Sequence, residues 1–394
     1  MMRVFAKLLL ASALASSVTA CGSTPKPVNK AKKEANKHDA KSLRKEARND
    51  VKSGDYDDAD KKYAEAYEQS KDFDMLEEYV HFLAKNGRAQ KAVDTAKPYY
   101  EGNIADPKGY ALYCDALLAA ENGVEALDVA TKMLEINNDD AEAHEKKGRA
   151  LILLGKEEGL EELRKAVHLD ASAANQITLG KALFQLGKVD EAALAFRAAV
   201  KDEPESPEAH AYLGMALRGQ SEYDEAKTHL EKAIDLDSTN GRAYFELGLI
   251  AGVQNKADEA ETALAKAVKL SPNDSQFWYA YGEVFRSTDR ADEAINAYRK
   301  AVELDPPYPK AQQKLGLLLV DKKEYDEAEV VLTQAIRRDK SVPINYFNLG
   351  LVYAAKKKNQ LAIENLEKFL QLAPRNDGDR GRARETLNTL KRKR

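Results

Sequence analysis

The chain has 394 residues, 43% of them apolar and 32% charged, with a formal net charge of −4 and only two cysteines. Two cysteines cannot form the disulfide framework of a small secreted domain. The slight acidic excess, with basic and acidic residues interspersed, argues against a nucleic-acid-binding protein. The composition suits an all-α array of short helices rather than one globular core.

The first segment, residues 1–20, has the plan of a secretory signal peptide. Arg3 and Lys7 precede an apolar run from Leu8 to Ala15, and small residues follow it. A transmembrane anchor needs about 20 apolar residues, and this run is shorter. We therefore expect the segment to be cleaved rather than to span a membrane.

A cysteine stands directly after this segment. The sequence Val18-Thr19-Ala20-Cys21 resembles the bacterial lipobox. The resemblance implies that Cys21 carries a lipid as the first residue of the mature protein; a cysteine placed there by chance is the alternative. Gly22 rather than aspartate follows, which favours the outer membrane under the enterobacterial sorting rule. We expect a lipid-anchored protein of the cell envelope, in the outer membrane and facing the periplasm.

Residues 21–39 are rich in lysine, asparagine and proline and contain almost nothing apolar. Such a segment is expected to be a flexible tether. Basic residues gather between Lys26 and Lys52 and again in the tail from Arg380 to Arg394. These ends are either solvated termini or contacts with anionic headgroups or acidic glycans.

Residues 40–376 carry a repeat with a period of 34, in which a glycine is followed twelve positions later by an alanine. Helical spacing of apolar residues on both sides of a short polar turn predicts two antiparallel helices that cross at this small pair. A larger side chain there would force the helices apart. The pairs are Gly180 and Ala192, Gly214 and Ala226, Gly248 and Ala260, Gly282 and Ala294, Gly316 and Ala328, and Gly350 and Ala362.

The earlier units are degenerate, with Gly148, Cys114, Val80 and Ala47 in the glycine place. The Gly148 unit is two residues short, and we place one deletion in its turn from Gly155 to Gly159. Cys114 is expected to be a buried, inert thiol, because burial keeps a thiol protonated. About ten units fit between residues 40 and 376. Residues 377–394 follow as an expected capping helix and basic tail.

The tripeptide Asp-Glu-Ala recurs at Asp190, Asp224, Asp258, Asp292 and Asp326. Five copies are too many for one active site, and neighbouring residues on a helix point in different directions. Acidic residues in a first helical turn complement the positive end of the helix dipole. We therefore interpret the tripeptide as the start of each second helix.

The period, its glycine and alanine places and prolines such as Pro204 at its end together resemble the tetratricopeptide repeat. Aromatic residues stand where that family prefers tryptophan, while other units depart from it and are expected to be locally weaker. The aromatics are Tyr110, Tyr244, Trp278 and Tyr346, and the departures are His144, Gln176, His210 and Gln312. The resemblance implies a solenoid of about ten helical hairpins in a right-handed superhelix, whose first helices line a concave protein-binding groove.

Chemical motifs are largely missing from the sequence. His144-Glu145 begins like a zinc-protease helix, but Gly148 stands where the second histidine would be. Gly-Lys pairs such as Gly155-Lys156 belong to the repeat and are not followed by Ser or Thr. We expect no metal, no cofactor, no small-molecule substrate and no enzymatic activity.

The resemblance places groove residues three before, one after and four after each glycine. Early units carry polar residues there, including Asp115, Glu145 and Arg149. Later units carry a more aromatic set, which supplies candidate binding anchors. That set is Phe245, Leu249, Tyr279, Glu283, Arg286, Gln313, Leu317, Phe347 and Leu351. The alternative is that these side chains pack against the next repeat and never meet a partner.

The sequence thus predicts a non-enzymatic, lipid-anchored scaffold that holds protein partners of an envelope machine. Similar lipoproteins belong to type IV pilus, gliding-motility and outer-membrane assembly systems. A component of a polysaccharide synthesis or export complex is the second hypothesis, and an enzyme of unknown type is the third.

Overall fold

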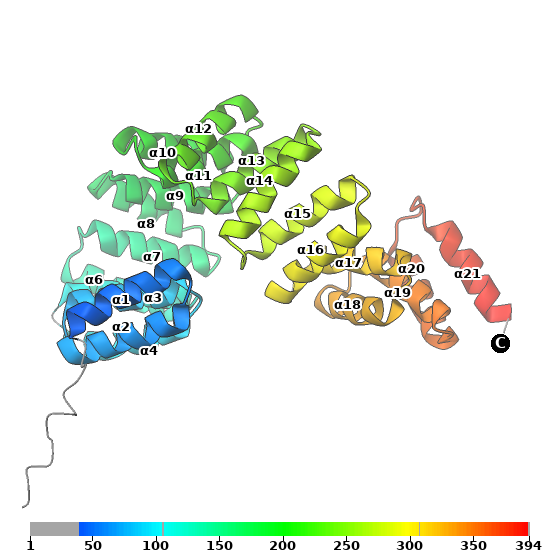
Figure 1. The fold of residues 1–394 in the computed structure, drawn as a ribbon, viewed down its shortest axis with the longest axis horizontal. Coiled ribbons are helices and arrows are strands. Elements are labelled where there is room, and N and C mark those ends of the chain that lie inside the picture. Colours follow the sequence, from blue (N-terminus) through cyan, green and yellow to red (C-terminus); the bar gives the residue numbers. More distant parts are fainter. Residues whose placement is uncertain (1–38, 105, 307, 393–394) are drawn as a thin grey trace, which may run out of the picture. The chain divides into compact units, whose positions relative to one another are not determined.

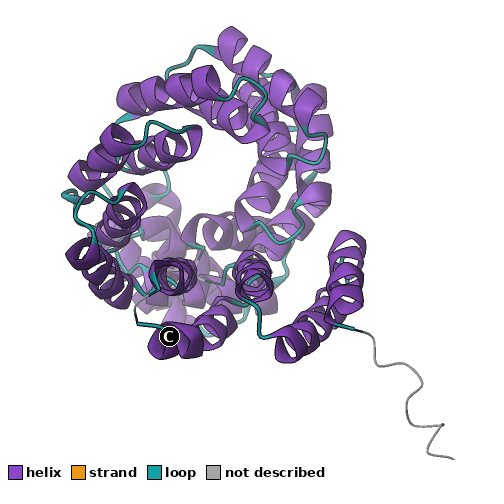
Figure 2. Cartoon of the chain, turned by 90° about the vertical axis from the view of Figure 1, so that its left-hand side faces the viewer, coloured by secondary structure: helices purple, strands orange, loops and turns teal. Residues whose placement is uncertain are grey.

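The computed structural model describes residues 39–392 apart from residues 105 and 307. Within this range the chain consists of helices joined by short loops, with no strand (Figure 2). The predictions for the signal peptide, for Cys21 and for the tether up to residue 38 lie outside the described residues. The chain divides into two compact units, residues 1–95 and 96–394.

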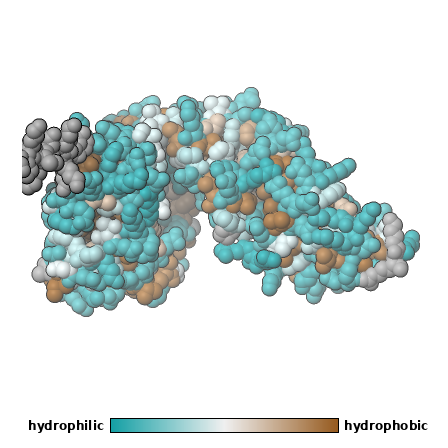
Figure 3. All heavy atoms as spheres, turned by 60° about the horizontal axis from the view of Figure 1, so that its bottom comes forward, coloured by the Kyte–Doolittle hydropathy of each residue, from teal (hydrophilic) through white to brown (hydrophobic). Residues whose placement is uncertain are grey.

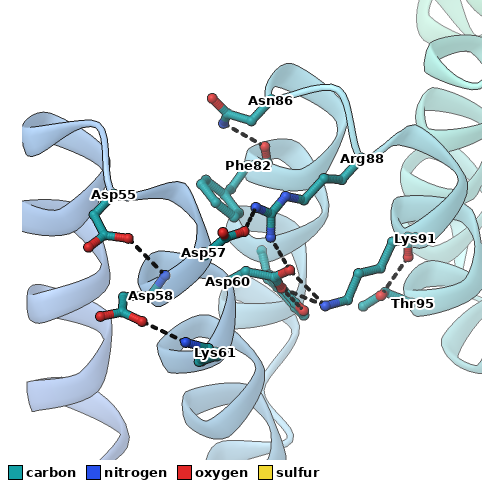
Figure 4. A network of polar contacts seen from close by, with 11 residues as sticks. Asp55, Asp57, Asp58, Asp60, Lys61, Phe82, Asn86, Arg88, Lys91 and Thr95 are labelled. Atoms are coloured by element: carbon teal, nitrogen blue, oxygen red, sulfur yellow. Dashed lines mark hydrogen bonds and ion pairs between the residues drawn. The ribbon is translucent and has the colours of Figure 1, made fainter.

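The first unit contains three helices and the beginning of a fourth (Figure 1). They are α1 (Ala40–Ser53), α2 (Tyr56–Ser70), α3 (Phe73–Lys85) and α4 (Ala89–Gly102). The buried carboxylate of Asp60 in α2 binds side chains from α3 and α4 and from the turn between them (Figure 4). The Tyr79 hydroxyl donates to it at 2.6 Å, and the Lys91 ammonium lies 2.7 Å away. The Arg88 guanidinium binds both Asp60 and Asp57. Removing one partner of such a buried network leaves a charge uncompensated, so it specifies how these helices pack.

The second unit continues the series of antiparallel hairpins. Its helices are α5 (Pro107–Ala119), α6 (Gly123–Ile136), α7 (Ala141–Leu153), α8 (Gly159–Leu169), α9 (Ala173–Gln185), α10 (Val189–Asp202), α11 (Pro207–Gly219), α12 (Tyr223–Leu236), α13 (Gly241–Val253), α14 (Ala257–Leu270), α15 (Ser275–Ser287), α16 (Ala291–Leu304), α17 (Pro309–Asp321), α18 (Tyr325–Arg338), α19 (Pro343–Ala355), α20 (Asn359–Leu372) and α21 (Arg380–Arg392). Across the described residues α1–α20 form ten hairpins, as the repeat predicted.

The glycine of each regular unit lies where its two helices approach most closely. A Cβ on Gly214 would lie 2.5 Å from Cγ of Leu230, and one on Gly282 would lie 2.7 Å from the ring of Tyr298. The large residue 16 positions later thus occupies the space that the glycine leaves, while Ala226 and its equivalents are fully buried. The predicted crossing at the small pair is confirmed.

The turn inside each hairpin places one residue in the left-handed backbone region. Among the described residues, glycine fills this place in four turns, and a residue with a side chain, such as Ser221 or Asn255, fills it in the other six. In the short unit the second helix, α8, has 11 residues, while α10 has 14, and the loop before α8 is longer than the loop before α10. The shortening is therefore seen in the helix after the turn, whereas we had placed a deletion in the turn itself.

The residue four places before each glycine place carries a side-chain donor in most units. This side chain donates a hydrogen bond to the backbone carbonyl of the residue six positions before itself. The pairs are Tyr110 and Ile104, His144 and Asn138, His210 and Pro204, Trp278 and Pro272, Gln312 and Pro306, and Tyr346 and Lys340, at 2.7–3.2 Å. Histidine and glutamine make the same bond as tryptophan. The structure therefore gives no reason for the weakness that we expected at His144 and His210, whereas Oε1 of Gln312 is buried without a hydrogen-bond partner among the described residues, which is destabilising.

Ion pairs connect successive repeats across the outer helices. Arg197 of α10 binds Glu225 of α12, and Arg299 of α16 binds Glu327 of α18, each pair 28 residues apart. The acidic partners belong to the first turns of α12 and α18, where the Asp-Glu-Ala tripeptide was expected. The tripeptide is thus structural: it starts the second helix and links it to the preceding unit.

The last helix closes the array. Ala383, Leu387 and Leu390 of α21 are buried, as expected for a cap, and the Arg380 guanidinium donates to the carbonyls of Leu370 and Ala373 at 2.8 Å. These bonds satisfy backbone groups at the end of α20. In the described part of the chain no helix has the length and apolar character needed to cross a membrane.

Candidate functional site: an aromatic pocket

The later repeats form a cavity of about 500 Å³ on the first helices α13 and α15. We call it the aromatic pocket. It is lined by Phe245, Gly248, Leu249, Gly252, Val253, Leu264, Gln276, Tyr279, Ala280, Glu283, Val284, Arg286, Ser287 and Tyr308. Most of these side chains are apolar or aromatic, with a few polar groups among them, which is the usual make-up of a binding pocket.

Local packing fixes the floor of the pocket. A Cβ on Gly248 would lie 2.6 Å from Cγ of Leu264, so the missing side chain lets α14 contribute Leu264 to the cavity. Phe245 stacks on Phe277 of the next repeat at 4.4 Å between ring centroids, and the Arg242 guanidinium lies 5.8 Å from the Phe245 ring. These contacts hold the floor rigid.

Two tyrosines form one wall. The ring of Tyr279 lies 5.2 Å from that of Tyr308 and 5.7 Å from that of Tyr298. Burial, followed by the neighbouring Tyr279 and acidic residues, raises the pKa of Tyr308 to about 12. Burial also raises the pKa of Tyr279. Both hydroxyls therefore stay protonated at neutral pH and can donate hydrogen bonds.

The charged groups in the lining neutralise each other. The Arg286 guanidinium donates to Glu283 at 2.9 Å, and the Tyr298 hydroxyl donates to the same carboxylate. Burial would raise the pKa of Glu283, but these two bonds outweigh it and hold the pKa below its ordinary value. At neutral pH the pocket thus presents an ion pair between Glu283 and Arg286 instead of a lone charge.

Five of the nine predicted groove residues line this pocket, and four do not. Phe245, Leu249, Tyr279, Glu283 and Arg286 come together as predicted. However, Phe245 is only 7% exposed and belongs to the floor, so it is not the free anchor that we expected. Gln313 and Leu317 lie on α17 outside the lining.

The prediction of an exposed aromatic at Phe347 is wrong. Phe347 is 2% exposed, packs on Phe369 at 5.1 Å, and has the Arg382 guanidinium of α21 5.4 Å from its ring. Leu351 is also partly buried in this core. The closing helix covers positions that line the groove in other repeats, so these two residues serve the cap.

The repeat pattern missed seven residues of the pocket lining, and Leu264, Ala280 and Val284 are three of them. Val253 and Ser287 stand five residues after their glycines, Gln276 stands six before, and Tyr308 precedes α17. Gly252 stands in a predicted groove position but has no side chain.

The earlier repeats form a different cavity of about 380 Å³, which we call the cationic pocket. Its lining is Leu118, Arg149, Ile152, Leu153, Thr178, Lys181, Ala182 and Gln185. Beneath it Lys146, 3% exposed, lies 2.8 Å from Asp115 and 3.2 Å from Glu142. Arg149 shares Asp115 at 3.3 Å, so the polar residues predicted for the early groove form one ion network.

Other candidate chemistry is structural within the described residues. Cys114 is fully buried, its thiol lies 3.4 Å from the carbonyl of Ala126, and burial raises its pKa to about 12. This confirms the predicted inert thiol. Between residues 39 and 392 no group of three or more His, Cys, Asp or Glu side chains is arranged to hold a metal ion.

Three family profiles match the chain. Two described as "Tetratricopeptide repeat" match residues 177–241 and 217–284, and one described as "Cytochrome c-type biogenesis protein H TPR domain" matches residues 261–380. No curated protein sequence is significantly similar to the chain.

Solved structures of other proteins share the fold. The Cut9-Hcn1 hetero-tetramer of the APC/C is 18% identical over 89% of this chain and 76% of that chain, with a TM-score of 0.52. The human IFIT1 dimer with PPP-AAAA is 17% identical over 83% and 89%, also with a TM-score of 0.52. Pseudomonas aeruginosa pilF is 20% identical over 60% and 100%, with a TM-score of 0.47. The predicted all-α superhelix of helical hairpins is confirmed.

Proposed function

The chain belongs to the tetratricopeptide-repeat proteins, and from this premise we propose that it is a non-enzymatic scaffold that holds a partner protein in the aromatic pocket. Proteins of this fold present the first helices of their hairpins to partners. The observation that carries the proposal is the pocket itself: an open apolar cavity with two tyrosine hydroxyls and a neutralised ion pair.

The face of the molecule drawn in Figure 3 supports this choice of site. On the face drawn in Figure 3, hydrophilic residues predominate and apolar ones are scattered. Scattered apolar residues are normal on soluble proteins, whereas a concave apolar cavity is the usual binding-site candidate. Val253, at the pocket, is 59% exposed, which makes it available to a partner.

The anchoring part of the proposal rests on the sequence of residues 1–39. We place the protein in the cell envelope, attached by a lipid on Cys21 to the outer membrane and facing the periplasm. Metabolic labelling with radioactive palmitate tests this: the parent chain should be labelled and found with membranes, and Cys21→Ser should be unlabelled. Equal labelling of both would contradict the lipid site.

The partner belongs, on this proposal, to an envelope machine of the type IV pilus, gliding-motility or outer-membrane assembly type. A polysaccharide synthesis or export complex is the alternative. Photocrosslinking in living cells from a probe residue at position 253 of the pocket, followed by isolation of the crosslinked chain from membranes, distinguishes them. An extended segment of an assembly component supports the first, and an outer-membrane barrel or a polymerase supports the second.

The groove assignment is tested by Tyr279→Glu, which puts an unpaired carboxylate beside Glu283 in the pocket wall. We expect this variant to lose the crosslinked partner while its helical circular dichroism is unchanged, because Tyr279 is only partly buried. Asn296→Glu, on the second helix of the same repeat, is the control. A partner retained by Tyr279→Glu would refute the pocket as the binding site.

A further inference from the structure

We propose that Gly252 is the residue that determines the specificity of the aromatic pocket, and that its missing side chain makes room for a bulky apolar side chain of an extended partner peptide. This inference rests on the proposed function of the pocket. It adds the chemical class of the group that enters the cavity.

Gly252 differs from the glycines that the fold requires. A Cβ at Gly148, Gly248 or the equivalent places of other repeats would lie less than 3 Å from a neighbouring side chain. A Cβ at Gly252 would meet nothing within 4 Å. No close packing inside the chain therefore demands glycine there, and its backbone φ is not in the left-handed region.

Glycine at this place is also unfavourable for the helix. Gly252 is the last residue but one of α13, and glycine forms helices less well than any residue except proline. From residue 114 onward the other repeats carry a side chain at the same place. Those residues are Leu118, Ile152, Phe184, Arg218, Arg286, Val320 and Ala354. The one repeat without a side chain there is one of the repeats that line the aromatic pocket, and the next repeat contributes Arg286 to the lining from the same place.

The neighbours of Gly252 indicate which group fills the space. Leu249, Val253 and Val284 supply aliphatic surface, and the tyrosine wall supplies rings. Glu283 already binds Arg286 and Tyr298, so the lining offers no unpaired charge that would compensate a charged ligand group. Burying an unpaired charge is costly, which excludes lysine, aspartate or glutamate as the occupant.

The size of the cavity agrees with this assignment. Its volume of about 500 Å³ exceeds what a small side chain fills, so an alanine or serine would leave most of the apolar wall uncovered. Phenylalanine, leucine or methionine in an extended peptide covers more of that wall. The polar groups of Gln276 and Ser287 in the lining are then available to the peptide backbone.

The test measures peptide binding to the full chain in detergent by fluorescence anisotropy. The ligands are fluorescein-labelled nonapeptides Gly-Ser-Gly-Ser-X-Ser-Gly-Ser-Gly, in which X is Phe, Leu, Ala or Glu. We expect the parent to bind the Phe and Leu peptides roughly tenfold or more tightly than the Ala and Glu peptides. Gly252→Ala should weaken the Phe peptide at least about fivefold, because the new methyl group occupies the cavity. The same variant should melt roughly 2 °C higher, because the helix is improved.

The matched control is Gly381→Ala in α21, another helical glycine at which a Cβ would meet nothing within 4 Å. It should raise Tm and leave peptide affinity unchanged. One outcome would refute only the inference on Gly252: peptides bind the parent and not Tyr279→Glu, but all four peptides bind equally and Gly252→Ala has no effect. The pocket would then still be the peptide-binding site. If no peptide binds the parent more tightly than it binds Tyr279→Glu, the peptide-binding function of the pocket fails as well.

Discussion

The aromatic pocket and the cationic pocket occupy the same places of the repeat and have different chemistry. Leu153 and Val253 both stand five residues after their glycines and both are exposed, at 39% and 59%. One lies beside Arg149 and Lys181, and the other beside Gly252 and the tyrosine wall. The hairpins are alike, so a few positions on the first helices determine what each stretch of the groove can bind.

The buried side chains that pack beneath the two pockets also differ in chemistry. The aromatic pocket rests on stacked rings, whereas the cationic pocket rests on Lys146 and its carboxylates. Ring stacking depends little on pH, whereas a buried ion network depends on the charge of every partner. The two regions should therefore fail under different substitutions and conditions.

The largest effect is expected from removing the ring under the aromatic pocket. Phe277 is 2% exposed and stacks on Phe245, so Phe277→Ala should lower the free energy of unfolding by about 3–5 kcal/mol through lost burial and a cavity. Urea unfolding followed by circular dichroism measures it, with exposed Val253→Ala as the control. A loss below about 1 kcal/mol would show that the stack does not support the pocket.

The corresponding change beneath the cationic pocket is Asp115→Asn. Burial by itself would lower the pKa of Lys146, but Asp115 and the neighbouring glutamates raise it, so the ammonium stays charged and needs its partners. Losing one carboxylate should cost about 3 kcal/mol in urea unfolding. Asp128→Asn, which breaks the exposed pair with Lys132, should cost less than about 1 kcal/mol. Equal costs would contradict the buried network.

The turns that follow the two pockets give a smaller pair of effects with opposite signs. Gly155 has φ +72° and an added Cβ would meet nothing, so Gly155→Ala should destabilise by about 1 kcal/mol through backbone strain alone. Asn255 has φ 57° at the equivalent turn, and Asn255→Gly should be stabilising by a few tenths of a kcal/mol. Thermal unfolding of both variants checks this; the same sign for both would refute the strain argument.

The smallest effect concerns the repeat between the two pockets. Nε2 of His210 lies 3.0 Å from the Pro204 carbonyl and must donate to it, so Nδ1 accepts from Nδ1 of His229 at 2.9 Å. Burial, and then the neighbouring imidazole of His210, lowers the pKa of His229. The unfolded chain then binds more protons below about pH 6.5, and stability should fall as the pH decreases from there.

His144 provides the comparison for that titration. Its Nδ1 lies 2.6 Å from Glu162. Burial would raise the pKa of Glu162, but the bonds from His144 and Lys147 hold the pKa below its ordinary value of 4.5. That contribution is present above about pH 4.5 and is lost only as the pH falls further. His229→Gln should flatten the stability profile between pH 6.5 and 5, while Glu162→Gln should not.

The repeat architecture could be predicted because a glycine is needed wherever a residue such as Leu230 fills the crossing. That requirement is local and recurs with the period. The closing helix was predictable for a similar reason, since Ala383, Leu387 and Leu390 lie on one face of it. The tautomer-dependent contacts of His210 and His229 could not be predicted, because they depend on how two helices are rotated against each other.

The pocket was only half predictable. The repeat frame identified Tyr279 and Arg286, because every first helix turns the same positions to the groove. It did not identify Tyr308, which lies in a loop, or the role of Gly252, because a missing side chain gains meaning only from the space around it. It misplaced Phe347, since the covering Arg382 belongs to the cap and not to the repeat.

The most direct measurement is photocrosslinking in living cells from a probe residue at position 253 or at position 153, which are equivalent places in the aromatic and the cationic pocket. The account predicts a protein crosslinked from position 253 that disappears in the Tyr279→Glu background, and no such product from position 153. The same product from both positions, or from position 153 alone, would contradict the claim that the aromatic pocket is the binding site.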